Sequence, residues 1–268
     1  MTLKSKKIIG VIHLLPTLGF EGFKSKEDIL SRALEDLNTL ITGGINSIIV
    51  ENNYDLPHKI NVNPETIVMM GYILGKIREK TDIELGISVL WNDYKTALSI
   101  AKIYNCQFVR VPVFVDTVKT SFGLIKGNAQ DIIEYRDQID ANNVKIYADI
   151  QVKHAELINK RPIKDASSEA IKKGADALII TGKWTGDAPL LDDLKDLKNN
   201  ISRDIPVIIG SGADENNINQ LLQYSDAVII STSLKEGNNQ LAEKERNIKN
   251  YDTKISLSKI KSFMSKLK

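Results

Sequence analysis

Eight short runs of aliphatic residues, spread along the whole chain, constrain the fold more than any other feature. Each run ends in a polar or glycine-rich loop, and an amphipathic helical pattern follows it. The runs cover residues 8–12, 47–50, 85–90, 108–113, 144–149, 177–181, 207–210 and 227–230. They are continuous and rich in β-branched residues rather than alternating, which is typical of strands covered on both faces. Such strands, each followed by a helix, predict a parallel sheet.

The segments between the runs carry the signals of helix ends. Ser25 is a capping residue, and Asp28 adds an acid to the first turn that follows. Apolar residues then recur at helical spacing until Gly43, which is a typical stop. Pro64 stands at the first position of the next helical pattern, where its missing N–H costs nothing. These signals support a repeated strand–helix unit.

The repeated unit predicts an α/β protein built as a single (β/α)8 TIM barrel over residues 1–268. The length is normal for this fold, and no shift in composition marks a second domain. An open doubly wound sheet is the alternative fold. Residues 236–254 are polar, and we expect them to form an insertion before the last helix.

Composition limits the classes of function. The chain has 36 basic and 34 acidic residues and no long block of like charge, so nothing indicates nucleic acid binding. Its one cysteine, Cys106, excludes an internal disulfide framework and fits a buried structural thiol. No apolar run has the length of a transmembrane segment, and no small-residue cleavage site follows the N-terminal run. We therefore expect a cytoplasmic protein, and a homo-oligomer fits a barrel of this size.

Polar residues follow every predicted strand. In a TIM barrel the C-terminal strand ends meet at one rim, where functional groups collect. The rim residues are His13, Glu51, Asn52, Asp55, Asn92, Arg110, Asp149, Lys153, His154, Thr181, Lys183, Gly210, Ser211, Gly212, Ser231, Thr232, Ser233 and Lys235. Their convergence predicts an active site.

The last two loops of this rim predict a phosphate site. Residues 210–212 read Gly-Ser-Gly and residues 231–233 read Ser-Thr-Ser. Glycines allow backbone N–H groups to approach an anion, hydroxyls add donors, and these loops are the usual phosphate cradle of the fold. We predict that all six residues bind phosphate; two tight turns without a ligand are the alternative.

Two carboxylates and a histidine are candidate catalytic groups. Asp149 fits an acid/base, a metal ligand or an internal ion pair with Arg110. Glu51 ends a buried strand, where an unpaired charge would be expensive. His13 closes the first strand, and the three side chains together could hold a divalent cation. No metal-specific spacing is visible, and no organic cofactor is implied.

Two further candidates follow the fifth strand. Lys153 suits neutralisation of a phosphate or carboxylate, or a Schiff base if its pKa were depressed; an exposed surface lysine is the alternative. His154 fits a proton shuttle or metal ligand, or a helix-capping or loop residue. The predicted substrate-binding residues are Asn52, Asp55, Asn92, Arg110, Thr181, Lys183 and Lys235.

Eight segments occur in the order of a known family. They are GVIHLLP (10–16), GGINSIIVENNYD (43–55), PET (64–66), VLWND (89–93), ADIQVKHA (148–155), DALIITGKWTG (176–186), GSG (210–212) and STSLK (231–235). Together they resemble the BtpA/SgcQ family over nearly the whole chain. The resemblance implies a phosphate-binding TIM barrel similar to phosphoribosylanthranilate isomerase, but it implies no substrate. One photosynthetic member is linked to photosystem I biogenesis as a peripheral thylakoid protein, and another sits with sugar-transport functions.

Two segments depart from the family pattern. Pro112 stands where the family usually has asparagine, which removes a side-chain amide from the rim. Residues 182–186 read Gly-Lys-Trp-Thr-Gly instead of a Gly-Ser-Gly-Thr-Gly type of loop, which adds charge and bulk. The preferred ligand can therefore differ within the family.

These features predict an enzyme that acts on a phosphorylated sugar, nucleotide or related metabolite. Isomerase, epimerase or lyase chemistry suits a carboxylate pair beside a phosphate cradle. Asp149 and Glu51 would be the acid/base or metal residues, with His13 assisting. Lys153 and Arg110 would balance substrate charge. The alternative is a non-catalytic binding or assembly factor.

Overall fold

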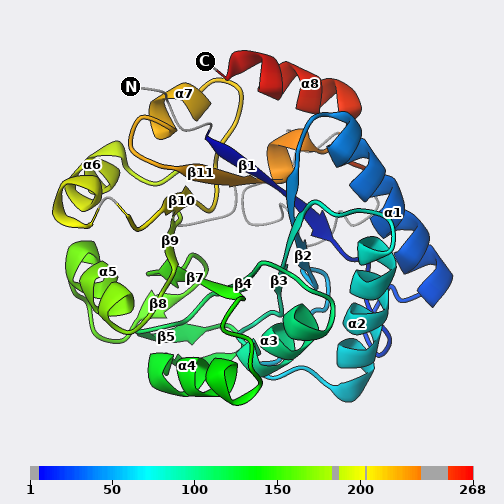
Figure 1. The fold of residues 1–268 in the computed structure, drawn as a ribbon, viewed down its shortest axis with the longest axis horizontal. Coiled ribbons are helices and arrows are strands. Elements are labelled where there is room, and N and C mark those ends of the chain that lie inside the picture. Colours follow the sequence, from blue (N-terminus) through cyan, green and yellow to red (C-terminus); the bar gives the residue numbers. More distant parts are fainter. Residues whose placement is uncertain (1–5, 183–186, 203, 237–252, 268) are drawn as a thin grey trace.

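The computed structural model describes residues 6–182, 187–202, 204–236 and 253–267. Eight parallel strands close into a barrel with helices around it (Figure 1), in the order β1-β11-β10-β9-β7-β4-β3-β2. The barrel strands are β1 (Lys7–His13), β2 (Ser47–Glu51), β3 (Glu84–Ser88), β4 (Phe108–Val111), β7 (Lys145–Ile150), β9 (Ala177–Ile180), β10 (Val207–Ile209) and β11 (Ala227–Ile230). The predicted TIM barrel is confirmed, and the open sheet is wrong.

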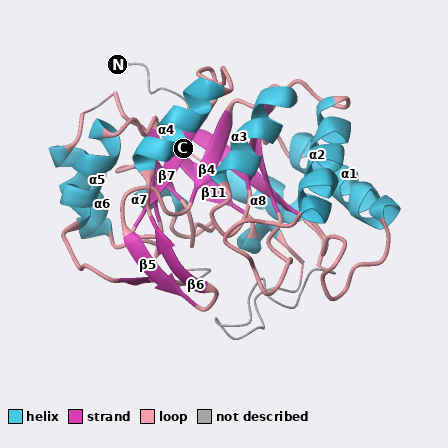
Figure 2. Cartoon of the chain, turned by 90° about the horizontal axis from the view of Figure 1, so that it is seen from below, coloured by secondary structure: helices cyan, strands magenta, loops and turns pink. Residues whose placement is uncertain are grey.

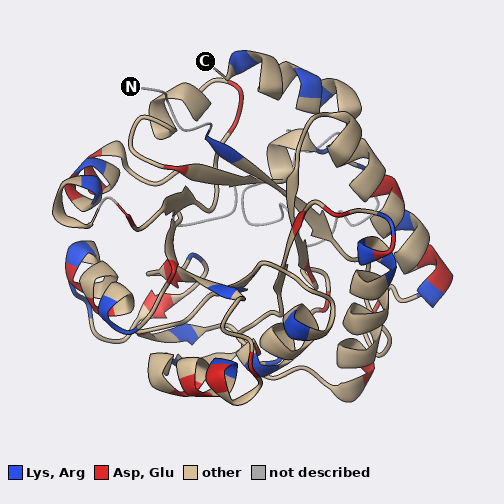
Figure 3. Cartoon of the chain, in the orientation of Figure 1, with Lys and Arg blue, Asp and Glu red and all other residues tan. Residues whose placement is uncertain are grey.

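The helices follow the strands as predicted. They are α1 (Lys26–Thr42), α2 (Pro64–Arg78), α3 (Tyr94–Ile103), α4 (Ala129–Gln138), α5 (Ile163–Lys172), α6 (Leu191–Asn200), α7 (Ile218–Leu221) and α8 (Leu257–Lys266), with a 3-10 turn η1 (Thr232–Leu234). Ser25 caps α1, since its side chain accepts a hydrogen bond from the N–H of Asp28 at 3.0 Å. Basic and acidic residues both occur on several outer helices, such as α1 and α5, whereas α8 carries basic residues and no acidic ones (Figure 3). No helix among the described residues has the length and apolar character needed to cross a membrane.

Two strands end earlier than their aliphatic runs, because the backbone N–H groups that follow them donate to asparagine side chains instead of to a neighbouring strand. The runs at 85–90 and 108–113 yield β3 and β4, which end at Ser88 and Val111. Leu90 N–H donates to Asn52 Oδ1 at 2.7 Å, and Val113 N–H donates to the Asn92 side chain at 2.9 Å. These amide side chains clasp neighbouring loops at the rim.

A small antiparallel sheet, which the sequence did not reveal, projects from one end of the barrel (Figure 2). It consists of β5 (Thr117–Thr120), β6 (Gly123–Lys126) and β8 (Glu156–Leu157), in the order β6-β5-β8. Trp91, Val113, Val118, Ile125 and Val152 form its core. The sheet ties the loop after β4 to the loop after β7.

The interior of the barrel is a packed core in which one glycine creates the space for an aromatic pair. Phe108 and Tyr147 stack with their ring centroids 4.4 Å apart. A Cβ on Gly86 would lie 2.1 Å from the Phe108 ring. Cys106 is buried as predicted, and burial raises the pKa of its thiol to about 12.

Most of the predicted polar insertion, residues 237–252, lies outside the described residues. Its two ends are paired, because Glu236 N–H donates to the carbonyl of Lys254 at 3.0 Å. Residues 236 and 254, which flank that segment, therefore lie side by side between η1 and α8.

Replacing Gly86 by alanine should destabilise the barrel, because the added methyl group overlaps the Phe108 ring. Overpacking of this kind costs roughly 1–3 kcal/mol, measurable as the free energy of unfolding in urea. Gly71→Ala in α2 is the matched control, since its Cβ would meet only Tyr104 at 3.8 Å. The account of the interior is wrong if both variants are equally stable, or if Phe108→Leu fails to rescue Gly86→Ala.

Candidate functional site

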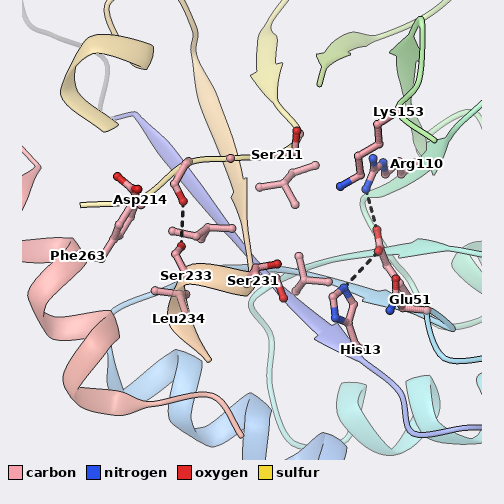
Figure 4. Close-up of a pocket in the computed structure, with 18 of the residues that line it drawn as sticks. His13, Glu51, Arg110, Lys153, Ser211, Asp214, Ser231, Ser233, Leu234 and Phe263 are labelled. Atoms are coloured by element: carbon pink, nitrogen blue, oxygen red, sulfur yellow. Dashed lines mark hydrogen bonds and ion pairs between the residues drawn. The ribbon is translucent and has the colours of Figure 1, made fainter. Parts of the chain in front are cut away.

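A cavity of about 810 Å³ lies at the C-terminal end of the barrel strands. Strand ends and loops of the barrel line it, together with one side of α8. His13, Glu51, Arg110 and Lys153 lie together at one end of it (Figure 4). The opposite end carries Phe263 of α8 and the loops after β10 and β11. One end of the cavity therefore holds a histidine, a carboxylate and two cations, and the other combines small polar groups and Phe263 with the charged side chains of Asp214, Glu215 and Lys259.

Arg110 joins two buried carboxylates at its end of the cavity. Its Nε and Nη2 donate to the two oxygens of Asp149, both at 2.8 Å. Its Nη1 donates to Glu51 Oε1 at 3.1 Å. The bidentate contact is among the strongest hydrogen-bonded ion pairs in proteins. Arg110 and Glu51 line the cavity, whereas Asp149 lies behind them and is not part of the lining. The ion pair that the sequence allowed for Asp149 is present.

His13 extends this chain of polar contacts across the barrel. It is the register neighbour of Glu51, and its Nε2 lies 3.7 Å from Glu51 Oε2. Its Nδ1 lies 3.0 Å from Nζ of Lys235, which also donates to the hydroxyl of Tyr54 at 2.8 Å. An ammonium group can only donate, so Nδ1 accepts and the imidazole proton is on Nε2, facing Glu51. Lys235 thus sets the tautomer of His13.

Burial and neighbouring charges shift the pKa values of these groups. Burial and the adjacent Lys235 lower the pKa of His13 to about 4. Burial acts to raise the pKa of Glu51, but Arg110 and His13 outweigh it and lower that pKa to about 2. Burial raises the pKa of Asp149, against the opposing effect of Arg110. At neutral pH His13 is therefore neutral, while Glu51 carries a charge.

Lys153 reaches the same end of the cavity from the loop after β7. Its backbone N–H donates to Thr181 Oγ1 at 3.1 Å. Its side chain lies beside Arg110 (Figure 4), and within the described residues its Nζ has neither a hydrogen bond nor an ion pair. Burial, followed by the charge of Arg110, lowers the pKa of this lysine to about 8. His154 lines the cavity next to it and has a positive φ of 61°.

The six residues predicted to bind phosphate all line the cavity. Two of their hydroxyls shape the loops: Ser211 donates to the carbonyl of Asp187 at 2.7 Å, and Ser233 donates to that of Ala213 at 2.9 Å. The hydroxyl of Ser231 is buried and has no hydrogen-bond partner among the described residues. A buried polar group without a partner needs an explanation, and a ligand is one.

Gly212 is required by the protein itself. It has a φ of +71°, and a Cβ there would lie 2.0 Å from the backbone nitrogen of Ala188. The loop after β9 therefore crosses directly over the loop after β10. The close approach of the two loops therefore requires glycine at position 212, independently of any approach by an anion.

Several predicted substrate-binding residues build the frame of the cavity without lining it. Asn52 and Asn92 clasp loops, and Asp55 accepts hydrogen bonds from the N–H and the hydroxyl of Thr17 at 2.7 and 2.8 Å. Thr181 and Lys235 likewise lie outside the lining, and Lys183 lies outside the described residues. Among the described members of that set, Arg110 alone faces the cavity.

One wall of the cavity was not predicted from the sequence. It consists of Ser258, Lys259, Ser262 and Phe263 on α8, and Trp91 and His58 close another side. The basic, amphipathic C-terminal sequence SKIKSFMSKLK by itself predicts a solvated last helix, with a membrane-surface helix as the alternative. Its apolar residue Phe263 is buried, and the small serines beside it leave room for a ligand. A last helix in which serines flank a single aromatic residue, Phe263, is the signal that could have revealed this wall.

The arrangement of the carboxylates does not favour the predicted metal site. Within the described parts of the chain, no group of three or more His, Cys, Asp or Glu side chains is placed to hold a metal ion. Arg110 occupies oxygens of both Glu51 and Asp149, so a cation bridging these carboxylates would have to displace a guanidinium.

Comparison with known proteins shows a family and a fold. The model of the BtpA family matches residues 4–252. The photosystem I biogenesis protein BtpA of Synechocystis is 38% identical over 235 residues, covering 87% of this chain and 81% of the relative. An uncharacterised protein of Archaeoglobus fulgidus is 36% identical, covering 91% and 97% of the two chains. The putative sgc region protein SgcQ of Escherichia coli is 26% identical, covering 86% and 87%.

Solved structures share the barrel at low sequence identity. Phosphoribosylanthranilate isomerase of Pyrococcus furiosus superposes with a TM-score of 0.57 at 11% identity, covering 97% of this chain and 98% of that one. Thiamine phosphate pyrophosphorylase of the same organism has a TM-score of 0.58 at 14% identity, covering 97% and 94%. At these identities the likeness shows the fold alone.

Acidification should destabilise the protein through His13. Its pKa is about 4 in the folded chain and 6.5 without the fold, so the unfolded chain binds the proton first as the pH falls. The contribution is complete above pH 6.5 and is lost as the pH falls to 4, by about 3 kcal/mol. Urea unfolding of the wild type and of His13→Gln across this range measures it. The variant should show a flatter pH dependence, and parallel curves would contradict the assignment.

Removing the Asp149 carboxylate should cost far more than removing a surface charge. Asp149→Ala leaves Arg110 buried with one partner, and breaking such a pair typically costs 3–5 kcal/mol. Glu79→Ala, which removes an exposed pair with Lys76, should leave the free energy of unfolding nearly unchanged. Equal stability of the two variants would show that Arg110 does not depend on Asp149.

Proposed function

The chain belongs to the BtpA family, and we propose that it is an enzyme acting on a phosphorylated metabolite. The observation that carries the proposal is the cavity, which combines a fixed arginine and two loops rich in small polar residues with a lysine whose amine has no partner within the described residues. The phosphate would lie against residues 210–212 and 231–233, and the reacting part of the molecule would face Arg110 and Lys153.

The size of the cavity supports a whole metabolite as the ligand. Sites for small molecules typically enclose 300–1,000 Å³. A volume of about 810 Å³ exceeds the need of an inorganic phosphate ion and suits a sugar phosphate or a nucleotide. Neighbours with the same fold include thiamine phosphate pyrophosphorylase and phosphoribosylanthranilate isomerase, whose names state phosphorylated compounds.

The contacts refine the roles of the candidate residues. Both oxygens of Asp149 are engaged by Arg110, so we assign it to holding the guanidinium in place. Glu51 lines the cavity as a charged carboxylate, with the Nε2–H side of neutral His13 facing it. Glu51, His13 and Lys153 are therefore the groups available for proton transfer, with His154 beside them at the edge. Isomerase, epimerase or lyase chemistry fits such a set.

A thermal-shift screen tests this proposal. Inorganic phosphate, sugar phosphates, nucleotides and divalent cations would each be added to the protein. A ligand at ~100 times its dissociation constant adds about 2.7 kcal/mol of stability. We expect a phosphorylated compound to raise the melting temperature and inorganic phosphate to compete with it. Equal shifts with the unphosphorylated counterparts would remove the phosphate site from the account.

Ser231→Ala should weaken binding of that compound without destabilising the protein. The hydroxyl of Ser231 has no partner among the described residues, so its loss breaks no observed contact. One lost hydrogen bond to the ligand costs about 0.5–1.5 kcal/mol, which is roughly a 2–10-fold weaker affinity by calorimetry. Ser167→Ala is the matched control, because Ser167 is also buried without a partner but lies on α5, outside the cavity lining. Equal affinities of the two variants would exclude Ser231 from the phosphate site.

A non-catalytic binding or assembly factor is the second candidate function. It is favoured by the 38% identical relative that is named as a photosystem I biogenesis protein. The two functions separate in a strain that lacks this protein. A folded Lys153→Met variant restores function if the protein acts only by binding a partner, and it fails if Lys153 takes part in chemistry.

We also propose a homo-oligomer in the cytoplasm. Neighbouring helices α2 and α3 expose apolar side chains, with Val68 71% and Ile103 69% accessible. Exposed apolar side chains mark contacts between subunits where they form a contiguous patch, and these two helices are the proposed place for one. Light scattering of the purified chain tests the oligomer, and a monomer at all concentrations would exclude it.

A further inference from the structure

Among the described charged side chains at the Arg110 end of the cavity, Lys153 alone has neither a hydrogen bond nor an ion pair, and we propose that it is a nucleophile. We infer that its amine forms an imine with an aldehyde or ketone group of the substrate. This inference rests on the proposed function for the phosphate, and it adds the second functional group of the substrate, a carbonyl. The enzyme would then be a lyase or another enzyme that uses an imine as an electron sink.

The contacts single out this side chain. Glu51 is bonded to Arg110 and faces His13, and both oxygens of Asp149 are bonded to Arg110. Lys235 donates to His13 and Tyr54. Nζ of Lys153 has no such partner within the described residues, although it lines the cavity. An amine that lines a ligand site and makes no contact that supports the fold is available to react with a ligand.

The position of the lysine supports the same conclusion. It follows β7, and the paired strand β4 carries Arg110, so the two cations enter the cavity side by side (Figure 4). A neighbouring cation is one of the arrangements that activates a lysine amine, because it disfavours the ammonium form. Lys259 on α8 provides the contrast. It lines the same cavity, but its Nζ is hydrogen-bonded to the carbonyl of Lys235 at 2.5 Å.

Charged groups from several elements surround the Lys153 amine. Arg110 favours the neutral amine, whereas Glu51, Asp149 and Asp187 oppose it, and burial exceeds them all. With its pKa lowered to about 8, roughly a tenth of the Lys153 amine is neutral at pH 7. An ordinary lysine with a pKa near 10.4 has less than ~0.1% of its amine in that form. The reactive form is therefore abundant near neutral pH.

The chemistry balances without a further reactant. The neutral amine adds to the carbonyl carbon, forming a C–N bond, and the carbonyl oxygen takes up protons and leaves as water. Overall, an ammonium group and a carbonyl give a protonated imine and one water molecule. The protonated imine withdraws electrons from the adjacent carbon, so that a C–C or C–H bond there can break.

Reductive trapping with two aldehyde probes tests the inference. The intact protein would be treated with pyridoxal 5′-phosphate or with pyridoxal, reduced with borohydride, and mapped by peptide mass spectrometry. Both probes carry the aldehyde, but only the first carries a phosphate. At pH 7 and limiting reagent we expect Lys153 to be modified at least about tenfold faster than Lys259, because the Lys153 amine makes no hydrogen bond within the described residues whereas Nζ of Lys259 is bonded to the carbonyl of Lys235. Lys153→Arg keeps the charge and should abolish this fast labelling, whereas Lys259→Arg should leave it intact.

The two probes separate failure of the imine from failure of the phosphate site. Fast labelling of Lys153 by both probes, with inorganic phosphate slowing only the phosphorylated one, supports the inference and the proposed function together. Fast labelling that phosphate does not affect supports the imine and contradicts the phosphate cradle. Labelling of Lys153 no faster than that of Lys259 overturns the inference, even if phosphorylated compounds still raise the melting temperature.

Discussion

The guanidinium of Arg110 is the constraint around which the barrel mouth is organised. A charge buried at the end of a barrel strand is tolerated only with partners of opposite charge and good geometry. Asp149 supplies a bidentate contact and Glu51 a third hydrogen bond, so β4 is tied to β7 on one side and to β2 on the other. The same contacts hold Glu51 at the cavity, where it would otherwise be an isolated buried carboxylate.

The consequences extend across the rim. Glu51 faces the Nε2–H of His13, and Lys235 fixes the tautomer of that histidine from the loop after β11. A chain of polar contacts thus links four strands and the last loop, and each member has a structural partner. Lys153 stands beside the chain without joining it. Within the described residues, every member of that chain of contacts is bonded to a neighbour, which makes the Lys153 amine the natural reactive group and separates residues that support the site from the residue that acts in it.

The sequence was sufficient for the architecture because β-branched runs and helix caps are local signals that recur with one period. It also led to candidate residues of which many line one cavity, since strand ends in a barrel converge at one rim. The sequence could not distinguish side chains that line the cavity from side chains that hold its loops in place. Asn52, Asp55 and Asn92 fall at strand ends, yet their side chains bond to backbone groups of neighbouring loops. Such pairings span about 20–40 residues and leave no local pattern. The small sheet of β5, β6 and β8 was missed because its strands are only two to four residues long.

The central claim is that the phosphate and the reacting carbonyl of one substrate occupy opposite ends of the cavity. A crystal structure of the protein soaked with ribose 5-phosphate at neutral pH tests it most directly. The account predicts phosphate density between residues 210–212 and 231–233, with the carbon chain directed toward Lys153. Phosphate density on Arg110 and Lys153 instead, with the two loops empty, would contradict it, because the Arg110 end would then be the anion site and Lys153 a ligand for the phosphate.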